Sequence, residues 1–203
     1  MAKFEPRIDV EALPLPAATR PGAIRPKNDP ASDLRPALYQ MAGVDLTPID
    51  GLNILSIQAI LSEIGTDMSK WTTVKHFTSW LGLSPHNQKT GGKVIRSKTK
   101  KTDNRANRAF RLAATLGRSQ SALGVFYRRM KAKLGTPKAV VATAHKLARI
   151  VYHLLKYQVP FSALPPAQED ARFRERALRN LQQKALKLVL EPVPESQTQE
   201  LVS

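Results

Sequence analysis

The sequence predicts an all-α fold for this chain of 203 residues. Apolar residues recur at helical spacing along most of it, and Gly or Pro separates the regular segments. Aromatic residues make up only 6% of the chain, so Leu, Ile, Val and Ala must form the core. We expect one helical domain with a helix-hairpin-helix-like element and a basic loop or hairpin, flanked by disordered tails.

Three regions are expected along the chain. Residues 1–31 contain six prolines and little periodicity, which predicts a disordered leader. Residues 32–160 form the helical domain, and residues 161–203 form a charged helix and a polar tail.

Three short helices are expected before residue 82. Ser32 and Asp33 would cap the first, which runs to Met41. The second ends at Gly65, and the third spans residues 73–81. The apolar positions of these last two helices are Ile54, Ile57, Ile60, Leu61 and Ile64, then Val74, Phe77, Trp80 and Leu81.

Residues 82–101 predict a loop or hairpin that turns at Gly91 and Gly92. A helix capped by residues 102–104 should follow, and further helices are expected over 121–134, 138–157 and 168–190. Thr136 would cap the helix over 138–157, with Pro137 in its first turn. The expected buried positions are Ala106, Ala109, Phe110, Ala113 and Leu116, then Leu147, Ile150, Val151, Leu154 and Leu155. The apolar positions of the helix over 121–134 are Leu123, Phe126, Tyr127, Met130 and Leu134.

The net charge of +16 lies in one third of the chain. Between Lys89 and Arg149 there are seventeen Lys and Arg residues and a single acid, Asp103, whereas the remainder has fifteen of each sign. A neutral scaffold with one basic segment is typical of a surface that binds a polyanion. The alternatives are a basic face that serves solubility and, less favoured, a membrane surface.

Several classes are disfavoured. The chain lacks cysteine, a secretory signal and any run of about 18 apolar residues, so we expect a cytoplasmic protein without disulfides or a membrane span. The four histidines lack metal-ligand spacing, and the acids before the basic segment are scattered. We therefore expect no metal site and no cofactor in this chain.

Two short motifs could contact phosphate. Residues 49–52, with Gly51, resemble half of a helix-hairpin-helix element, which presents backbone N–H groups to phosphate. In residues 89–93, the Thr90 hydroxyl stands beside two glycines and between two lysines, so it could approach a phosphodiester closely. An ordinary glycine turn explains the first motif equally well, and a plain basic turn would explain the second.

Several motifs, in order, resemble the C-terminal transposase domain of the insertion-sequence 116/110/902 family, the bridge-RNA-guided serine-type transposases. The resemblance runs from about Asp33 to Leu190. The motifs include Ile49-Asp50-Gly51, Ser62-Glu63-Ile64-Gly65, Trp80-Leu81-Gly82-Leu83-Ser84-Pro85, Thr90-Gly91-Gly92-Lys93, Ser97-Lys98-Thr99, Asn104-Arg105, Tyr127-Arg128-Arg129 and His145-Lys146-Leu147-Ala148-Arg149.

The resemblance implies DNA transposition by a hydroxyl nucleophile that links covalently to DNA. It also implies a guide RNA, a homo-oligomer, association with the nucleoid, and an N-terminal RuvC-like domain whose acids bind Mg²⁺. We expect that domain to be missing from this chain and to act in cis or in trans. Thr90 stands where the family has its nucleophilic serine, and the threonine methyl restricts the side chain.

The predicted catalytic residue is thus Thr90. The predicted nucleic-acid contacts are Lys89, Gly91, Gly92, Lys93, Arg96, Lys98, Lys100, Lys101, Arg105, Arg108 and Gly51. Two rival hypotheses remain: a non-catalytic, nucleic-acid-binding remnant of a decayed insertion sequence, and a basic structural protein without a specific partner.

Overall fold

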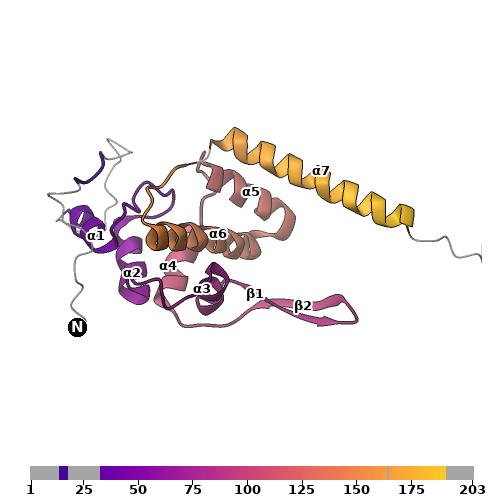
Figure 1. The fold of residues 1–203 in the computed structure, drawn as a ribbon, viewed down its shortest axis with the longest axis horizontal. Coiled ribbons are helices and arrows are strands. Elements are labelled where there is room, and N and C mark those ends of the chain that lie inside the picture. The colour runs from indigo at the N-terminus through magenta and orange to yellow at the C-terminus, as the bar shows by residue number, and fades with distance from the viewer. Residues whose placement is uncertain (1–13, 18–32, 164, 191–203) are drawn as a thin grey trace, which may run out of the picture. The chain divides into compact units, whose positions relative to one another are not determined.

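The computed structural model describes residues 14–17, 33–163 and 165–190. These ranges contain seven helices and one two-stranded antiparallel sheet (Figure 1), which confirms the predicted helical fold with a hairpin. No helix in these ranges is long and apolar enough to cross a bilayer. The elements are α1 (Arg35–Ala42), α2 (Ile54–Ile64), α3 (Val74–Trp80), β1 (Pro85–Thr90), β2 (Lys93–Thr99), α4 (Arg105–Ala113), α5 (Ala122–Leu134), α6 (Thr136–Tyr157) and α7 (Pro166–Leu190).

The chain forms two compact units, one up to Ala163 and one from Leu164 onward. The first unit contains α1 to α6 and the hairpin, and the second contains α7. Apart from residues 14–17, the predicted leader lies outside the described residues, and so does the predicted tail over residues 191–203.

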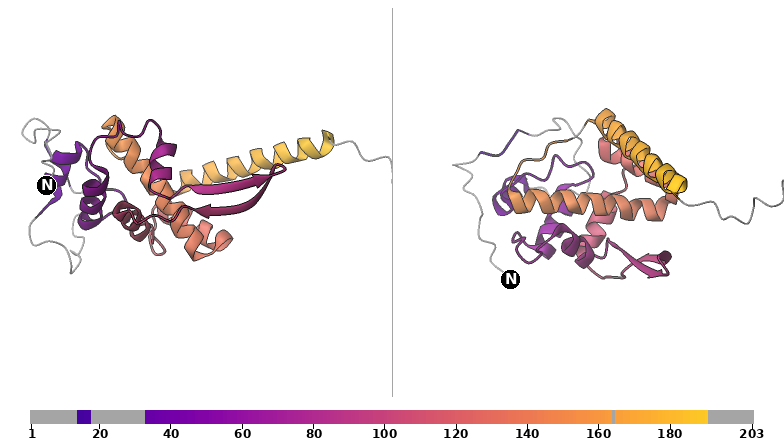
Figure 2. Two further views of the ribbon diagram at one scale, coloured as in Figure 1. Left: turned by 90° about the horizontal axis from the view of Figure 1, so that it is seen from below. Right: turned by 45° about the vertical axis from the view of Figure 1, so that its right-hand side comes forward.

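Helix α6 is the centre of the first unit. It packs against α3, α4 and α5, while α2 packs against α4 and α1 (Figures 1 and 2). Leu147, Val151 and Leu155 on α6 are fully buried, because they recur along one face of the helix. Ile150, expected in the core, is only partly buried at the edge of that face.

Aromatic rings join the end of α6 to α3. The Tyr152 ring lies 5.4 Å from the Phe77 ring, and its hydroxyl donates to the Trp71 carbonyl at 2.8 Å. Trp71, just before α3, packs 5.0 Å from Phe77 and fills the place that the sequence assigned to Trp80. That prediction was wrong: Trp80 is 43% exposed and packs on the outer side of Trp71.

A contact between residues far apart in the sequence also joins the C-terminal ends of α1 and α6. The Gln158 amide, just after α6, donates to the Ala42 carbonyl at 3.2 Å. Gly43 has a φ of 76°, and an added Cβ there would overlap the Gln158 side chain. The glycine is therefore required both by its left-handed conformation and by this close approach.

Side-chain caps define most helix starts. Asn53, Thr73, Asn104 and Ser121 accept hydrogen bonds from the backbone N–H groups at the starts of α2, α3, α4 and α5. The Asp33 side chain also accepts from the backbone N–H of Arg35 at 3.1 Å, as its predicted role at the start of α1 requires, although Leu34 directly precedes the helix. The predicted cap at Thr136 was wrong, because Gly135 precedes α6 and offers no side chain.

Two of the predicted apolar positions also need correction. Leu116 is buried but lies beyond the end of α4, and Leu134, in the last turn of α5, is 41% exposed. Leu116 thus belongs to the core as its spacing predicts, although α4 ends at Ala113, whereas Leu134 follows the same spacing but does not join the core.

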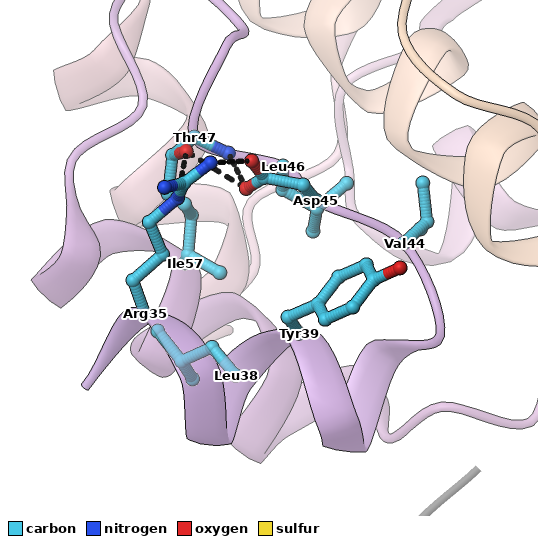
Figure 3. Close-up of a pocket in the computed structure, with 8 residues that line it drawn as sticks. All are labelled: Arg35, Leu38, Tyr39, Val44, Asp45, Leu46, Thr47 and Ile57. Carbon is cyan, nitrogen blue, oxygen red and sulfur yellow. Dashed lines mark hydrogen bonds and ion pairs between the residues drawn. The ribbon is translucent and has the colours of Figure 1, made fainter. Parts of the chain in front are cut away.

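A buried ion pair anchors α1 to the segment that follows it. Arg35 donates to the Asp45 carboxylate at 2.5 Å and to the Thr47 hydroxyl at 3.1 Å (Figure 3). Asp45 also accepts from the Thr47 backbone N–H at 3.0 Å, so its charge is fully hydrogen-bonded. The cavity between these residues measures about 10 Å³, room for one water molecule at most, so it is too small for a ligand.

Asp45→Asn should lower the free energy of unfolding by about 3 kcal/mol, because it leaves the mostly buried Arg35 guanidinium without its counter-charge. The matched control is Asp103→Asn, which removes the partner of Arg108 in an exposed pair and should cost less than about 1 kcal/mol. Urea denaturation of both variants measures the difference, and equal losses would contradict the structural role of Asp45.

A second prediction concerns pH. Burial, and then the positive charge of Arg149, lower the pKa of His145 from its ordinary value of 6.5. The unfolded chain therefore binds this proton more readily, and stability should fall as the pH drops through about 6.5. His145→Gln should flatten this slope between pH 7 and 5 in thermal melts. His153→Gln changes an exposed imidazole on the same helix and should leave the slope intact; an unchanged slope in His145→Gln would contradict the prediction.

Candidate nucleic-acid interface

The predicted phosphate-contacting turn is the tip of the β1–β2 hairpin. Thr90 pairs with Lys93 across a two-residue loop, in which Gly91 and Gly92 have φ angles of 55° and 75°. Hairpin loops of this length favour positive φ at both positions, and glycine takes it without strain. An added Cβ at either glycine would meet no atom within 4 Å, so the backbone at the tip is open to an approaching ligand.

A β-bulge places Lys93 and Lys98, two basic residues of the hairpin, on one face. Directly opposed residues share a face and the faces alternate along β1, so Thr90 lies on the same face as His86. Their partners, Lys93 and Lys98, are five residues apart. On a regular strand, residues an odd number apart lie on opposite faces. The extra residue on β2, Ile95, corrects the alternation and brings both lysines to the face of Thr90.

Not all of the predicted contacts on the hairpin can be placed. Lys89 and Arg96 occupy β1 and β2, but their side chains fall outside the described part of the structure. Lys93, Lys98 and Thr90 are exposed. Lys100 and Lys101 follow β2 in the link to α4, and both are exposed as well.

Two contacts hold the base of the hairpin to the helical core. The Asn107 amide on α4 donates to the Leu81 carbonyl at the end of α3, at 2.6 Å, and Asn107 is buried. Gly82 has a φ of 69°, and a Cβ there would overlap the Thr102 methyl group. The chain entering β1 and the chain leaving β2 are thereby held side by side.

Helix α4 presents three exposed arginines beside the hairpin, because its apolar residues face the core. Ala106, Ala109, Phe110 and Ala113 are buried, which confirms the predicted inner face. The exposed residues are Arg105, Arg108 and Arg111, and Arg108 forms an ion pair with Asp103. Both side chains of that pair are largely exposed, so the pair is weak and Arg108 stays available to a polyanion.

The three candidate hydroxyls lie at different heights of the hairpin, with Ser84 at its base, Ser97 along β2 and Thr90 at its tip. Ser84 is half-buried and hydrogen-bonded to Thr78 at 2.9 Å. Ser97 is exposed but pairs with Asn87, which puts it on the face opposite Thr90. Thr90 alone among these three stands next to the open glycine turn and shares a face with Lys93. Geometry therefore favours Thr90 as a nucleophile over Ser84 and Ser97.

Gly51 has a structural explanation. Its φ is 89°, and an added Cβ would overlap the Ala113 carbonyl at the end of α4. The neighbouring Asp50 accepts hydrogen bonds from the Ser119 and Ser121 hydroxyls, which ties the same turn to the start of α5. This packing accounts for the glycine without a ligand, and the phosphate contact at Gly51 remains a prediction from the sequence.

The described residues contain no group of three or more His, Asp or Glu side chains arranged to hold a metal ion. The donor set that Mg²⁺ would need is not assembled in this part of the chain. His145 is half-buried on α6, and His153 packs 4.7 Å from the Tyr157 ring, so neither lies with the hairpin.

Comparison with known proteins agrees with this arrangement. No curated protein and no solved structure matches the chain significantly. The model of the transposase IS116/IS110/IS902 family matches residues 45–128, a segment that runs from the Asp45 cluster through the hairpin and α4 into α5. The match confirms the resemblance read from the sequence and supports a function in DNA transposition or recombination. Residues 45–128 are therefore similar to the transposase IS116/IS110/IS902 family.

Proposed function

We propose that this domain binds nucleic acid along its hairpin and α4, and presents the Thr90 hydroxyl to a phosphodiester. The observation that carries the proposal is the common face of Thr90, Lys93 and Lys98, at the open tip of a hairpin within a transposase-family domain. Cations on that face would bind phosphates, and the tip would place the hydroxyl against one of them.

The proposed reaction is a transfer of the phosphoryl group to the protein. The Thr90 oxygen forms a bond to phosphorus, the bond from phosphorus to one sugar oxygen breaks, and the released sugar oxygen takes up a proton in exchange for the one that threonine loses. Lys93, paired with Thr90, would stabilise the charge that develops on the phosphoryl oxygens. The energy of the phosphodiester is kept in the covalent link, so the step can be reversed onto another strand.

The proposal requires partners. An acidic RuvC-like domain, in cis or in trans, would supply the Mg²⁺ ligands that the described residues do not assemble. DNA and a guide RNA are the proposed polyanions, a second copy of the chain the proposed protein partner, and the cytoplasm with its nucleoid the proposed location. Binding to DNA or RNA can be tested with the chain by itself, whereas the covalent step needs the acidic domain.

Arg105→Glu combined with Arg108→Glu should weaken oligonucleotide binding at least about tenfold near 0.1 M salt, because two phosphate contacts become repulsive. Fluorescence anisotropy across a salt series measures both the affinity and its salt slope. The control is Arg174→Glu with Arg176→Glu, two exposed arginines of α7 that give the same change in net charge. Equal losses in the two variants would show that net charge, rather than the α4 surface, governs binding.

With a RuvC-like domain of the family supplied in trans, DNA should become attached to Thr90. Thr90→Val keeps the shape but removes the hydroxyl and should abolish the adduct, whereas Thr90→Ser should raise its yield, since serine rotates more freely. Proteolysis and mass spectrometry locate the linkage. An adduct on Ser84 or Ser97 would contradict the assignment, and no adduct with any partner, with binding intact, would favour the non-catalytic remnant.

A further inference from the structure

A basic pocket opens at the base of the hairpin, away from the Thr90 tip. Its volume is about 290 Å³, and it lies between the end of β2, the start of α4 and the neighbouring α6. Four cationic residues line it: Lys98, Lys100, Lys101 and Arg111. Arg111 was not among the predicted contacts, because only the fold brings it to the three lysines.

The pocket has a fixed frame. Gly82 and Asn107 both line it, and both belong to the contacts that close the hairpin base. Thr102 also lines it and accepts a hydrogen bond from the Asn104 backbone N–H, one residue before α4 begins. Because these groups are held by the core, the pocket keeps its shape while the four cationic chains adjust around it.

The charge of the pocket is not neutralised from within. No Asp or Glu is among its lining residues, and Asp103, the nearest acid in the sequence, pairs with Arg108 on the exposed side of α4. Four like charges around one hollow repel each other, and an anion seated there would relieve that repulsion. The first turn of α4 adds partial positive charge, since Asn107 lies within it.

Size and lining restrict the ligand. Its volume lies at the lower end of pockets that take drug-sized molecules or cofactors, about 300 Å³, so it suits a small group. Leu83 and Val141 contribute an apolar part of the lining, and the four cationic residues contribute a charged part. A phosphate with its attached sugar matches both the size and the mixed lining.

We propose that this pocket binds one backbone phosphate of the nucleic acid and thereby sets the register of the strand at Thr90. Lys98 pairs with His86, four residues from Thr90 along β1, which corresponds to about 13 Å. At about 3.4 Å per nucleotide, the bound phosphate would lie roughly four or more nucleotides from the one that Thr90 meets. This inference rests on the proposed function, because it assigns the ligand of the same surface.

The first test uses inorganic phosphate and the full chain. Backbone N–H signals of Gly82, Lys101 and Thr102 should shift saturably during an NMR titration at constant ionic strength, whereas those of Lys131 and Lys133 on α5 should not. Lys100→Gln with Lys101→Gln should abolish the shifts. The matched control, Lys131→Gln with Lys133→Gln, removes two exposed charges from the same basic segment and should preserve them. Absence of shifts in the unaltered chain would overturn the pocket.

The second test uses labelled duplex oligonucleotides and separates the two proposals. One phosphate contact contributes roughly 0.9 to the slope of log affinity against log salt. Lys100→Gln with Lys101→Gln should therefore lower that slope by about 1 more than the α5 control, Lys131→Gln with Lys133→Gln, does. Equal slopes in the two variants would overturn the pocket inference and leave the proposed function standing. If the unaltered chain binds no oligonucleotide, the proposed function fails, and with it the assignment of a nucleic-acid phosphate to the pocket.

Discussion

The buried hydrogen bond from Asn107 to the Leu81 carbonyl is the contact on which the candidate interface depends. A two-stranded hairpin without a third strand is only marginally stable in water. This hairpin becomes a defined element because both of its ends continue into helices, α3 before it and α4 after it, that pack on α6. Asn107 joins those two helices directly at the hairpin base. The position of the Thr90 tip therefore derives from the helical core, although no core residue touches it.

The core and the basic surface are built from the same short segments. Helix α4 shows the division in nine residues: its Ala and Phe side chains are buried, while its three arginines are exposed. Small alanines on the inner face let α4 lie close to α2 and α6, and the arginines stay on the exposed side. The concentration of cations is unfavourable in the free chain, because like charges repel. Binding a polyanion removes that cost, so the charge pattern favours a bound state over an isolated one.

Much of this fold could be predicted from the sequence, because its helices carry local signals. Asn104 and Ser121 cap the starts of α4 and α5, and Gly65 ends α2, all as predicted. Local signals do not determine which of two similar residues is buried when the answer depends on residues distant in the sequence. Trp71 and Trp80 are both aromatic residues near α3, and only the position of Tyr152 on α6 decides that Trp71 is the buried one.

The candidate site shows the same limit. The Gly91-Gly92 turn and the lysines around it were predicted, since a glycine pair between two polar strands is a local hairpin signal. The bulge at Ile95 was not, because it depends on pairing between the strands, and it alone determines that Lys93 and Lys98 share a face. The role of Arg111 could not be foreseen either, since its three lysine neighbours come from a different element.

The position of Thr90 also explains why a domain of this kind would act together with another. A nucleophile at the end of a hairpin is accessible to a strand, but few groups surround it there. Lys93 and Lys98 share its face, and the described residues offer no carboxylate cluster for a metal. A hydroxyl buried in a complete site could react with water or with any phosphodiester that entered. Under the proposed function, a hydroxyl carried on an open tip would react only when another domain closes over it, and strand cleavage would be confined to the assembled complex. The base of the hairpin is fixed by Asn107 and bordered by cations, so on the same proposal it would hold the strand before that assembly forms.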